Sequence, residues 1–151
     1  MIPSLFVVTE NPAPLAGMRF PQPDTDWQAL HRRGFVLVIR LHPAEYDPAP
    51  LVAEDFTLED LYGGRAPSDA AAEQQRIWDA ARLAAQHLTR GEGVVVHCLG
   101  GKGRTGTVLA CALQVLGRST DDAIETVRKH RPEWPESPWQ EEVVRFGPAL
   151  R

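Results

Sequence analysis

The sequence predicts an α/β fold: a single domain over residues 1–151, with a mainly parallel central sheet of four or five strands flanked by helices. Strand-like and helix-like segments alternate along the chain, as parallel pairing requires. Two short runs, residues 35–39 and 94–96, are continuously apolar and rich in β-branched side chains, which is typical of buried parallel strands. The length of 151 residues fits one domain.

Segments rich in proline and glycine separate the expected elements of the N-terminal half. The runs predicted as strands are residues 5–8, 35–39 and 56–58. The segments expected to be irregular are residues 11–23, which hold four prolines, residues 42–50, and a turn at residues 63–64. Residues 24–26 are expected to cap a helix that ends before Gly34.

The C-terminal half is predicted to hold four helices around one more strand, residues 94–96. Their expected first residues or caps are Ser68 or Asp69, Thr105, Ser119 and about Pro138. The helix over residues 105–116 is apolar on nearly every side, which predicts that it is buried.

Composition excludes several classes of function. The net charge of −4 argues against a broad basic surface for nucleic acid or anionic lipid. The longest apolar run, residues 108–113, is too short to span a bilayer, and residues 1–5 do not resemble a signal peptide. A cytoplasmic protein is therefore expected. The two cysteines, Cys98 and Cys111, have neither zinc-site nor disulfide-framework spacing.

The most informative segment runs from the strand at 94–96 through a glycine-rich stretch into the buried helix. We call residues 98–104 the cysteine loop. Ligands of open α/β sheets bind at the carboxyl ends of strands, and a helix N-terminus there offers free N–H groups to an anion. Glycines allow such a loop to curl with several N–H groups pointing inward. The residues expected to cradle a phosphate in this way are Leu99, Gly100, Gly101, Lys102, Gly103 and Arg104.

Four side chains around this cradle suggest covalent chemistry. A cysteine at a helix N-terminus is ionised more readily than a free thiol, so Cys98 is the candidate nucleophile. The planar guanidinium of Arg104 can hold two phosphate oxygens. The hydroxyl of Thr105 is placed to donate a hydrogen bond to the sulfur, and His97 is placed to support the loop backbone from behind.

The order Val-His-Cys-x5-Arg-Thr-Gly, residues 96–106, resembles the signature of the cysteine-based protein tyrosine phosphatase superfamily. Gly101 and Gly103 also match its glycine positions. Two further stretches, residues 15–36 and 121–132, resemble the small atypical dual-specificity phosphatases. The resemblance is dense between about residues 91 and 132 and looser towards the N-terminus.

The resemblance implies a two-step mechanism in which the cysteine attacks phosphorus and an aspartic acid protonates the leaving oxygen. That acid lies on a loop before the cysteine, and Asp60 is favoured over Glu59 and Asp55. Many relatives place a water-orienting glutamine before the last helix. Here the comparable position is Glu136, while Gln140 is expected on the helix itself.

The resemblance implies no cofactor and no metal. The substrate class stays open among phosphotyrosine, phosphoserine or phosphothreonine, phosphoinositide and nucleic-acid 5′-phosphate. A phosphorylated protein or a phosphoinositide is the expected partner, with a protein tyrosine or dual-specificity phosphatase preferred and a lipid phosphatase as the alternative. The sequence does not indicate an oligomeric state.

Two interpretations from other functional classes, both of them binding modules, compete with the catalytic interpretation. Residues 101–106 also spell Gly-x-Gly-x-x-Gly, the dinucleotide-binding pattern, after a strand and before a helix. However, Asp121 and Asp122 begin a helix instead of ending a second strand, as the pattern would need. A non-catalytic phosphate-binding module would have no need of Cys98.

The phosphate-binding and dinucleotide-binding interpretations predict different stabilising ligands. If the cysteine loop binds phosphoryl groups, phosphate or vanadate at 100 times its Kd should raise the free energy of unfolding by about 2.7 kcal/mol. The measurement is the melting temperature with each oxyanion and with NAD. Stabilisation by NAD, with no response to the oxyanions, would favour the dinucleotide interpretation.

Overall fold

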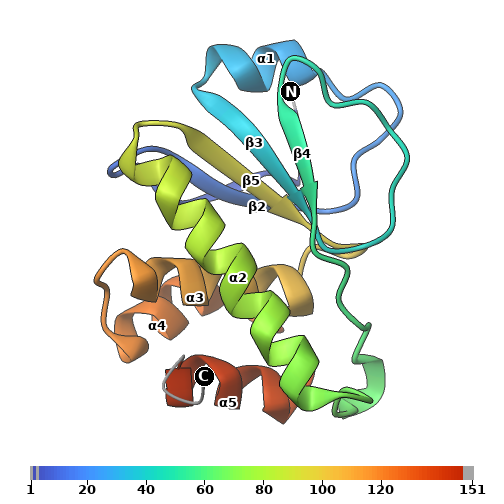
Figure 1. The fold of residues 1–151 in the computed structure, drawn as a ribbon, viewed down its shortest axis with the longest axis vertical. Helices are drawn as coiled ribbons and strands as arrows, with labels where there is room; N and C mark the ends of the chain where they lie inside the picture. Colours follow the sequence, from blue (N-terminus) through green and yellow to red (C-terminus); the bar gives the residue numbers. More distant parts are fainter. Residues whose placement is uncertain (1, 3, 148–151) are drawn as a thin grey trace.

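A five-stranded sheet forms the centre of the molecule, for which the computed structural model describes residues 2 and 4–147 (Figure 1). The spatial order is β1 (Phe6–Thr9), β2 (Leu15–Met18), β5 (Gly93–His97), β3 (Phe35–Arg40) and β4 (Val52–Asp55). The β1–β2 pair is antiparallel, and every other pair is parallel. The predicted α/β class with a mainly parallel sheet is confirmed. Residues 1, 3 and 148–151 of the expected domain lie outside the described part.

The helices divide between the two faces of the sheet (Figure 1). One face carries α1 (Trp27–Arg32), and the other carries α2 (Ala70–Thr89), α3 (Gly103–Val115), α4 (Thr120–His130) and α5 (Pro138–Phe146). A short 3₁₀ turn, η1 (Tyr62–Gly64), precedes α2. Alternate residues of β5 enter the two cores: Val94 and Val96 face α3, and Val95 faces Leu30 of α1.

The predicted helices are all present, and all but α3 begin at a polar side-chain cap. Asp26, Asp69, Ser119 and Ser137 each accept a hydrogen bond from a backbone N–H of the first turn. The predicted burial of the helix after the cysteine loop is confirmed, since α3 is buried from Gly103 to Leu113. None of the described helices has the length and apolarity that crossing a membrane demands.

The proline-rich segment predicted as irregular contains a strand, so that part of the prediction was wrong. Residues 15–18, Leu-Ala-Gly-Met, form β2, and all four residues are buried. Their own β-propensity is low, but β2 lies between β1 and β5 and is paired on both edges. Gly17 is also needed there, because a Cβ would lie 2.5 Å from the Phe6 ring.

The strand predicted over residues 56–58 was also misplaced. The strand is β4, residues 52–55, an edge strand whose side chains are mostly exposed and therefore lack an apolar pattern. Residues 56–58 leave the sheet as an extended segment, in which Leu58 donates its N–H to Leu41 O (3.0 Å) and buries its side chain. This segment brings the following residues, 59–65, to the carboxyl end of β5.

Candidate active site

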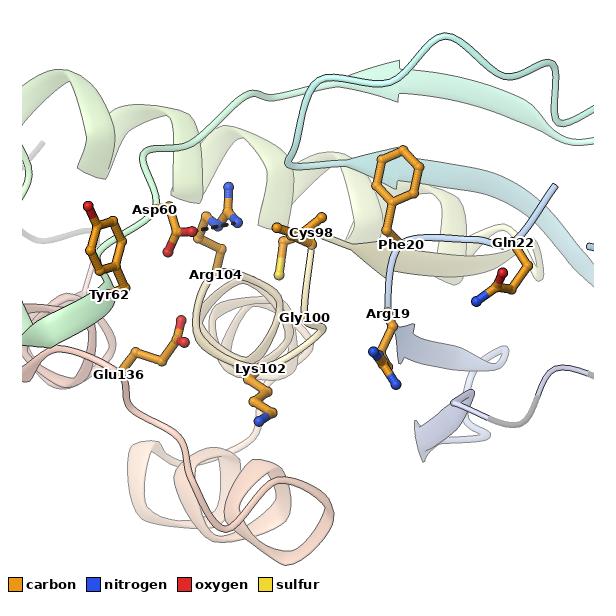
Figure 2. Close-up of a pocket in the computed structure, with 11 residues that line it drawn as sticks. Arg19, Phe20, Gln22, Asp60, Tyr62, Cys98, Gly100, Lys102, Arg104 and Glu136 are labelled. Carbon is orange, nitrogen blue, oxygen red and sulfur yellow. Dashed lines mark ion pairs between the residues drawn. The ribbon is translucent and has the colours of Figure 1, made fainter.

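A cavity of about 410 Å³ opens over the cysteine loop, at the junction of β5 and α3 (Figure 2). The strand ends at His97, the loop turns across the carboxyl edge of the sheet, and α3 begins at Gly103. The residues that line the cavity are Arg19, Phe20, Gln22, Asp60, Tyr62, Cys98, Leu99, Gly100, Lys102, Arg104 and Glu136.

The carbonyl groups of the cysteine loop are held outward. Donors outside the loop bind three of them: His97 Nδ1 binds Cys98 O at 3.0 Å, Phe20 N binds Leu99 O at 3.0 Å, and Arg131 Nε binds Gly101 O at 3.2 Å. Within α3, Thr107 Oγ1 binds Gly103 O at 2.7 Å. Because a peptide's N–H and C=O point in opposite directions, the N–H groups face the interior of the loop, where they would bind an anion.

Two glycines make this loop geometry sterically possible. Gly101 has φ +75°, and a Cβ on it would lie 2.7 Å from Met18 O. A Cβ on Gly103 would lie 2.0 Å from Glu136 Oε1. A side chain at either position would push the loop away from its neighbours, so the glycines predicted for the cradle serve close packing as well as curvature.

The sulfur of Cys98 lies at the floor of the cavity (Figure 2). Cys98 is 2% exposed, and Gly101 N–H donates to its Sγ at 3.3 Å. Cys111 lies in the middle of α3, and burial raises the pKa of its thiol well above the ordinary value. Of the two cysteines, Cys98 is therefore the one that is placed at a cavity, beside a helix N-terminus.

The guanidinium of Arg104 is oriented by two hydrogen bonds and one ion pair. Its NH1 contacts Leu58 O and His42 Nδ1, each at 3.2 Å, and its NH2 lies 3.7 Å from Asp60 Oδ2. Its buried Nε has no hydrogen-bond partner among the described residues. The Nε and NH2 edge is thus the side of the fork that is available to an oxyanion.

The hydrogen bond predicted between Thr105 and the sulfur is not formed in this structure. Thr105 Oγ1 is buried and has no partner in the part of the chain that the structure describes. The predicted role of Thr105 stays a prediction.

His97 and Tyr46 support the loop from behind. Burial lowers the pKa of His97 to about 4, so the ring is neutral near pH 7. Since Cys98 O only accepts, His97 Nδ1 carries the proton, and Nε2 accepts from the Tyr46 hydroxyl at 2.6 Å. Burial also raises the pKa of Tyr46 and keeps its hydroxyl protonated. The Tyr46 ring stacks on Trp27 with centroids 5.2 Å apart.

The three acidic candidates near the loop have different surroundings. Asp55 is paired with Arg40 at 2.6 Å, and this hydrogen bond lowers the pKa of Asp55. Glu59 accepts from the backbone N–H of Ser68 at 2.9 Å, which lowers its pKa, and it does not line the cavity. Asp60 lines the cavity and faces it (Figure 2). The geometry therefore favours Asp60 as the acid.

Glu136 also lines the cavity, on the same side of the cysteine loop as Asp60 (Figure 2). Gln140 lies on α5, as expected, where its Oε1 accepts from the N–H groups of Glu136 and Ser137 at 2.9 and 3.3 Å. The glutamine therefore caps the helix, and a carboxylate occupies the cavity wall instead.

Several residues of the site were missed by the sequence analysis. Phe20 and Arg19 follow the unrecognised strand β2, while His42 and Tyr46 lie in a segment predicted as irregular. Their role depends on contacts across the sheet, for which residue spacing provides no signal. The exposed Tyr62 was also missed, since it belongs to the turn after Asp60.

Comparison with known proteins identifies the family. Residues 16–118 match the family described as "Tc-R-P: Polymorphic toxin system, DSP-PTPase phosphatase". The chain belongs to this family. Membership makes it a phosphatase of the cysteine-based superfamily, which hydrolyses phosphoric monoesters, and confirms the resemblance to small dual-specificity phosphatases.

Individual relatives agree with this assignment. Protein tyrosine phosphatase type IVA 3 of Mus musculus is 29% identical over 128 residues, covering 83% of this chain and 69% of that protein. Dual specificity protein phosphatase CDC14C of Homo sapiens is 31% identical over 158 residues, covering 99% of this chain and 33% of that protein. This DSP-PTPase chain thus spans about a third of the length of CDC14C.

Solved structures share the fold. Tk-PTP in its active form has a TM-score of 0.73 at 26% identity, with 97% of each chain covered. A single-residue variant of human DUSP28 has a TM-score of 0.76 at 17% identity and supports the fold alone, covering 95% of this chain and 93% of that chain.

The depressed pKa of His97 predicts an acid-sensitive phosphatase fold. The unfolded residue takes up a proton near its ordinary pKa of 6.5, and the folded residue only near 4. Between these values the unfolded state binds more protons, so stability falls as the pH falls. From pH 7 to pH 5 the loss from His97 should be about 2 kcal/mol.

Chemical denaturation at both pH values measures this loss in the wild type, in His97→Asn and in the control His31→Asn, which changes an exposed histidine of α1. The His97 variant should lose most of the pH dependence, and the control should keep it. An unchanged pH dependence in His97→Asn would show that this ring is not held neutral by burial.

Proposed function

We propose that this phosphatase hydrolyses phosphate esters on protein side chains by double displacement through Cys98. The supporting observation is the placement of Cys98 Sγ at the floor of the cavity, inside a loop whose carbonyls point outward and beside the unpaired Nε of Arg104. This arrangement holds a phosphoryl group with its phosphorus facing the sulfur.

In the first step the Cys98 thiolate attacks phosphorus, an S–P bond forms, and the ester P–O bond breaks. The loop N–H groups and the Nε and NH2 of Arg104 bind the three equatorial oxygens, whose charge must be stabilised in the transition state. Asp60, in its protonated form, donates its proton to the departing oxygen. The products are the dephosphorylated side chain and phosphocysteine.

In the second step a water molecule attacks the phosphocysteine, the S–P bond breaks, and the thiolate of Cys98 is restored. Asp60, now ionised, accepts the proton from that water, and inorganic phosphate leaves. His97 acts through the loop backbone and touches neither substrate nor phosphorus. It is a positioning residue, held in one tautomer by Tyr46.

The substrates inferred are phosphorylated proteins, with both phosphotyrosine and phosphoserine or phosphothreonine accepted. The relatives' names, protein tyrosine phosphatase and dual specificity protein phosphatase, support this class. The rim of the cavity is partly apolar, since Leu99 is 51% and Tyr62 is 64% exposed. A cytoplasmic location stays a prediction from the sequence.

Replacing the nucleophile tests the covalent step. Cys98→Ser should lower turnover of p-nitrophenyl phosphate at least about a thousandfold, because a serine hydroxyl is not ionised near neutral pH. The matched control is Cys111→Ala, which removes the other thiol of the chain. Rapid acid quench should trap labelled phosphocysteine in the wild type and in the control only. Turnover above a few per cent in Cys98→Ser would contradict the mechanism.

Replacing the acid tests the proton transfer. Asp60→Asn should lower turnover about 10²- to 10⁴-fold on alkyl phosphates, whose leaving oxygen needs a proton. The loss should shrink on activated aryl phosphates, and the alkaline limb of the pH profile should flatten. The comparison variant is Glu59→Gln, which weakens the hydrogen bond that Glu59 accepts from the Ser68 N–H and should slow every substrate alike. A uniform loss in Asp60→Asn would assign the acid to another residue.

A further inference from the structure

The segment that carries Asp60 connects the sheet to α2, and we call residues 59–68 the acid loop. Its two ends are joined, because the Glu59 carboxylate accepts from Ser68 N–H at 2.9 Å and from Ser68 Oγ at 3.3 Å. The N–H of Glu59 donates at 2.7 Å to Oε2 of Glu73, a buried residue in the first turn of α2. The ends of the acid loop are therefore fixed to the helix that follows it.

The middle of the acid loop has little packing of its own. Of residues 61–66, Leu61 alone is buried. Gly63 and Gly64 have φ values of +75° and +81°, and a Cβ on either would meet nothing within 4 Å. A side chain that binds the backbone here therefore restricts a turn that packing leaves loose.

Arg65 makes such a contact with the residue that carries the acid. Its NH2 donates to the main-chain oxygen of Asp60 at 2.9 Å and lies 3.3 Å from Glu59 Oε2. Its guanidinium lies over the Tyr62 ring, with Cζ 5.0 Å from the ring centroid. One side chain therefore closes the acid loop upon itself, across the two glycines.

The carboxyl group of Asp60 depends on its own main chain for its direction. Its ion pair with Arg104 is long, at 3.7 Å between Oδ2 and NH2, and the Asp60 side chain is 40% exposed. A proton donor has to come within about 2.6–3.2 Å of the oxygen that it protonates. A small displacement of the Asp60 backbone would thus separate the acid from the leaving oxygen.

From these contacts we infer that Arg65 is a positioning residue for the general acid: it fixes the main chain of Asp60 so that the carboxyl group faces the leaving oxygen. The inference rests on the proposed function, in which Asp60 donates the proton. Arg65 does not line the cavity, so it acts through Asp60. An arginine suits this position because its planar group donates to a carbonyl while its face stacks on an aromatic ring.

The effect of Arg65 should be selective for proton donation. Leu58, on the near side of Asp60, supplies the carbonyl to which Arg104 NH1 donates at 3.2 Å. A displacement at Glu59, next to Leu58, therefore reaches the phosphate-binding guanidinium as well as the acid. The bond from Arg65 lies on the far side of Asp60, at the carbonyl, so its loss should leave phosphate binding intact.

The test measures kcat/KM, which reports transfer to Cys98 and omits the hydrolysis step. On an alkyl phosphate, Arg65→Gln should lower kcat/KM about tenfold, less than Asp60→Asn because the acid is still present. On p-nitrophenyl phosphate the loss should be less than about twofold, since that leaving oxygen needs little protonation. Arg65→Lys should recover most of the loss, because an ammonium group also donates to a carbonyl. The matched control is Arg90→Gln, which removes an exposed arginine paired with Glu92 at the other end of α2 and should change neither rate.

Two further measurements separate positioning from other roles. In the Asp60→Asn background, Arg65→Gln should cause no further loss, since no acid is left to position. The Kd of inorganic phosphate, measured by isothermal titration, should be the same in Arg65→Gln and in the wild type. The melting temperature of Arg65→Gln should shift no more than that of Arg90→Gln.

The outcomes separate this inference from the proposed function. An unchanged rate in Arg65→Gln would overturn the inference. A loss that is equal on both substrates, that persists in the Asp60→Asn background or that accompanies weaker phosphate binding would also overturn it, because Arg65 would then act on the fold or on the substrate. If Asp60→Asn alone slowed both substrates alike, the acid in the proposed function would be wrongly assigned, whatever the result at Arg65.

Discussion

The outward anchoring of the carbonyl groups in the cysteine loop is the constraint on which the site depends. A peptide that turns its oxygen away from the centre presents its N–H there, so the anion cradle is created by what binds the oxygens. His97, Phe20 and Arg131 supply three of those donors. Gly101 is part of the same constraint, since only a residue without a Cβ approaches Met18 O closely enough for Phe20 to reach the loop.

The donors come from three separate parts of the chain. The geometry of the active site therefore depends on the tertiary packing of nearly the whole molecule. Phe20 follows β2, His97 ends β5, and Arg131 follows α4. Tyr46 and Trp27 fix His97 from the opposite face of the sheet. Loss of any of these segments would release a carbonyl and turn one N–H away from the phosphate. Positioning residues far from the phosphorus are thus as important as those lining the cavity.

The sequence predicted the parts of the structure that depend on local pattern. The order strand, glycine-rich loop and buried helix, with Cys98 and Arg104 six residues apart, indicated the cradle because all its parts are neighbours in the chain. The strand β2 was missed because pairing on both edges overrides weak β-propensity, and β4 was misplaced because an exposed edge strand lacks apolar alternation. Contacts such as Arg104 with His42 join residues 62 positions apart, beyond the reach of periodicity.

Buried polar groups of the site that have no partner lower the free energy of unfolding, and this links phosphate binding to stability. Arg104 Nε and Thr105 Oγ1 are buried without partners among the described residues, and each such group destabilises a fold by about 1–3 kcal/mol. The partly buried Arg131 adds a cation whose charge is met mainly by carbonyl dipoles. An oxyanion in the loop supplies the missing acceptor for Arg104 and offsets the surplus charge at once. The unpaired Nε of Arg104 is therefore one source of the affinity of the loop for phosphate.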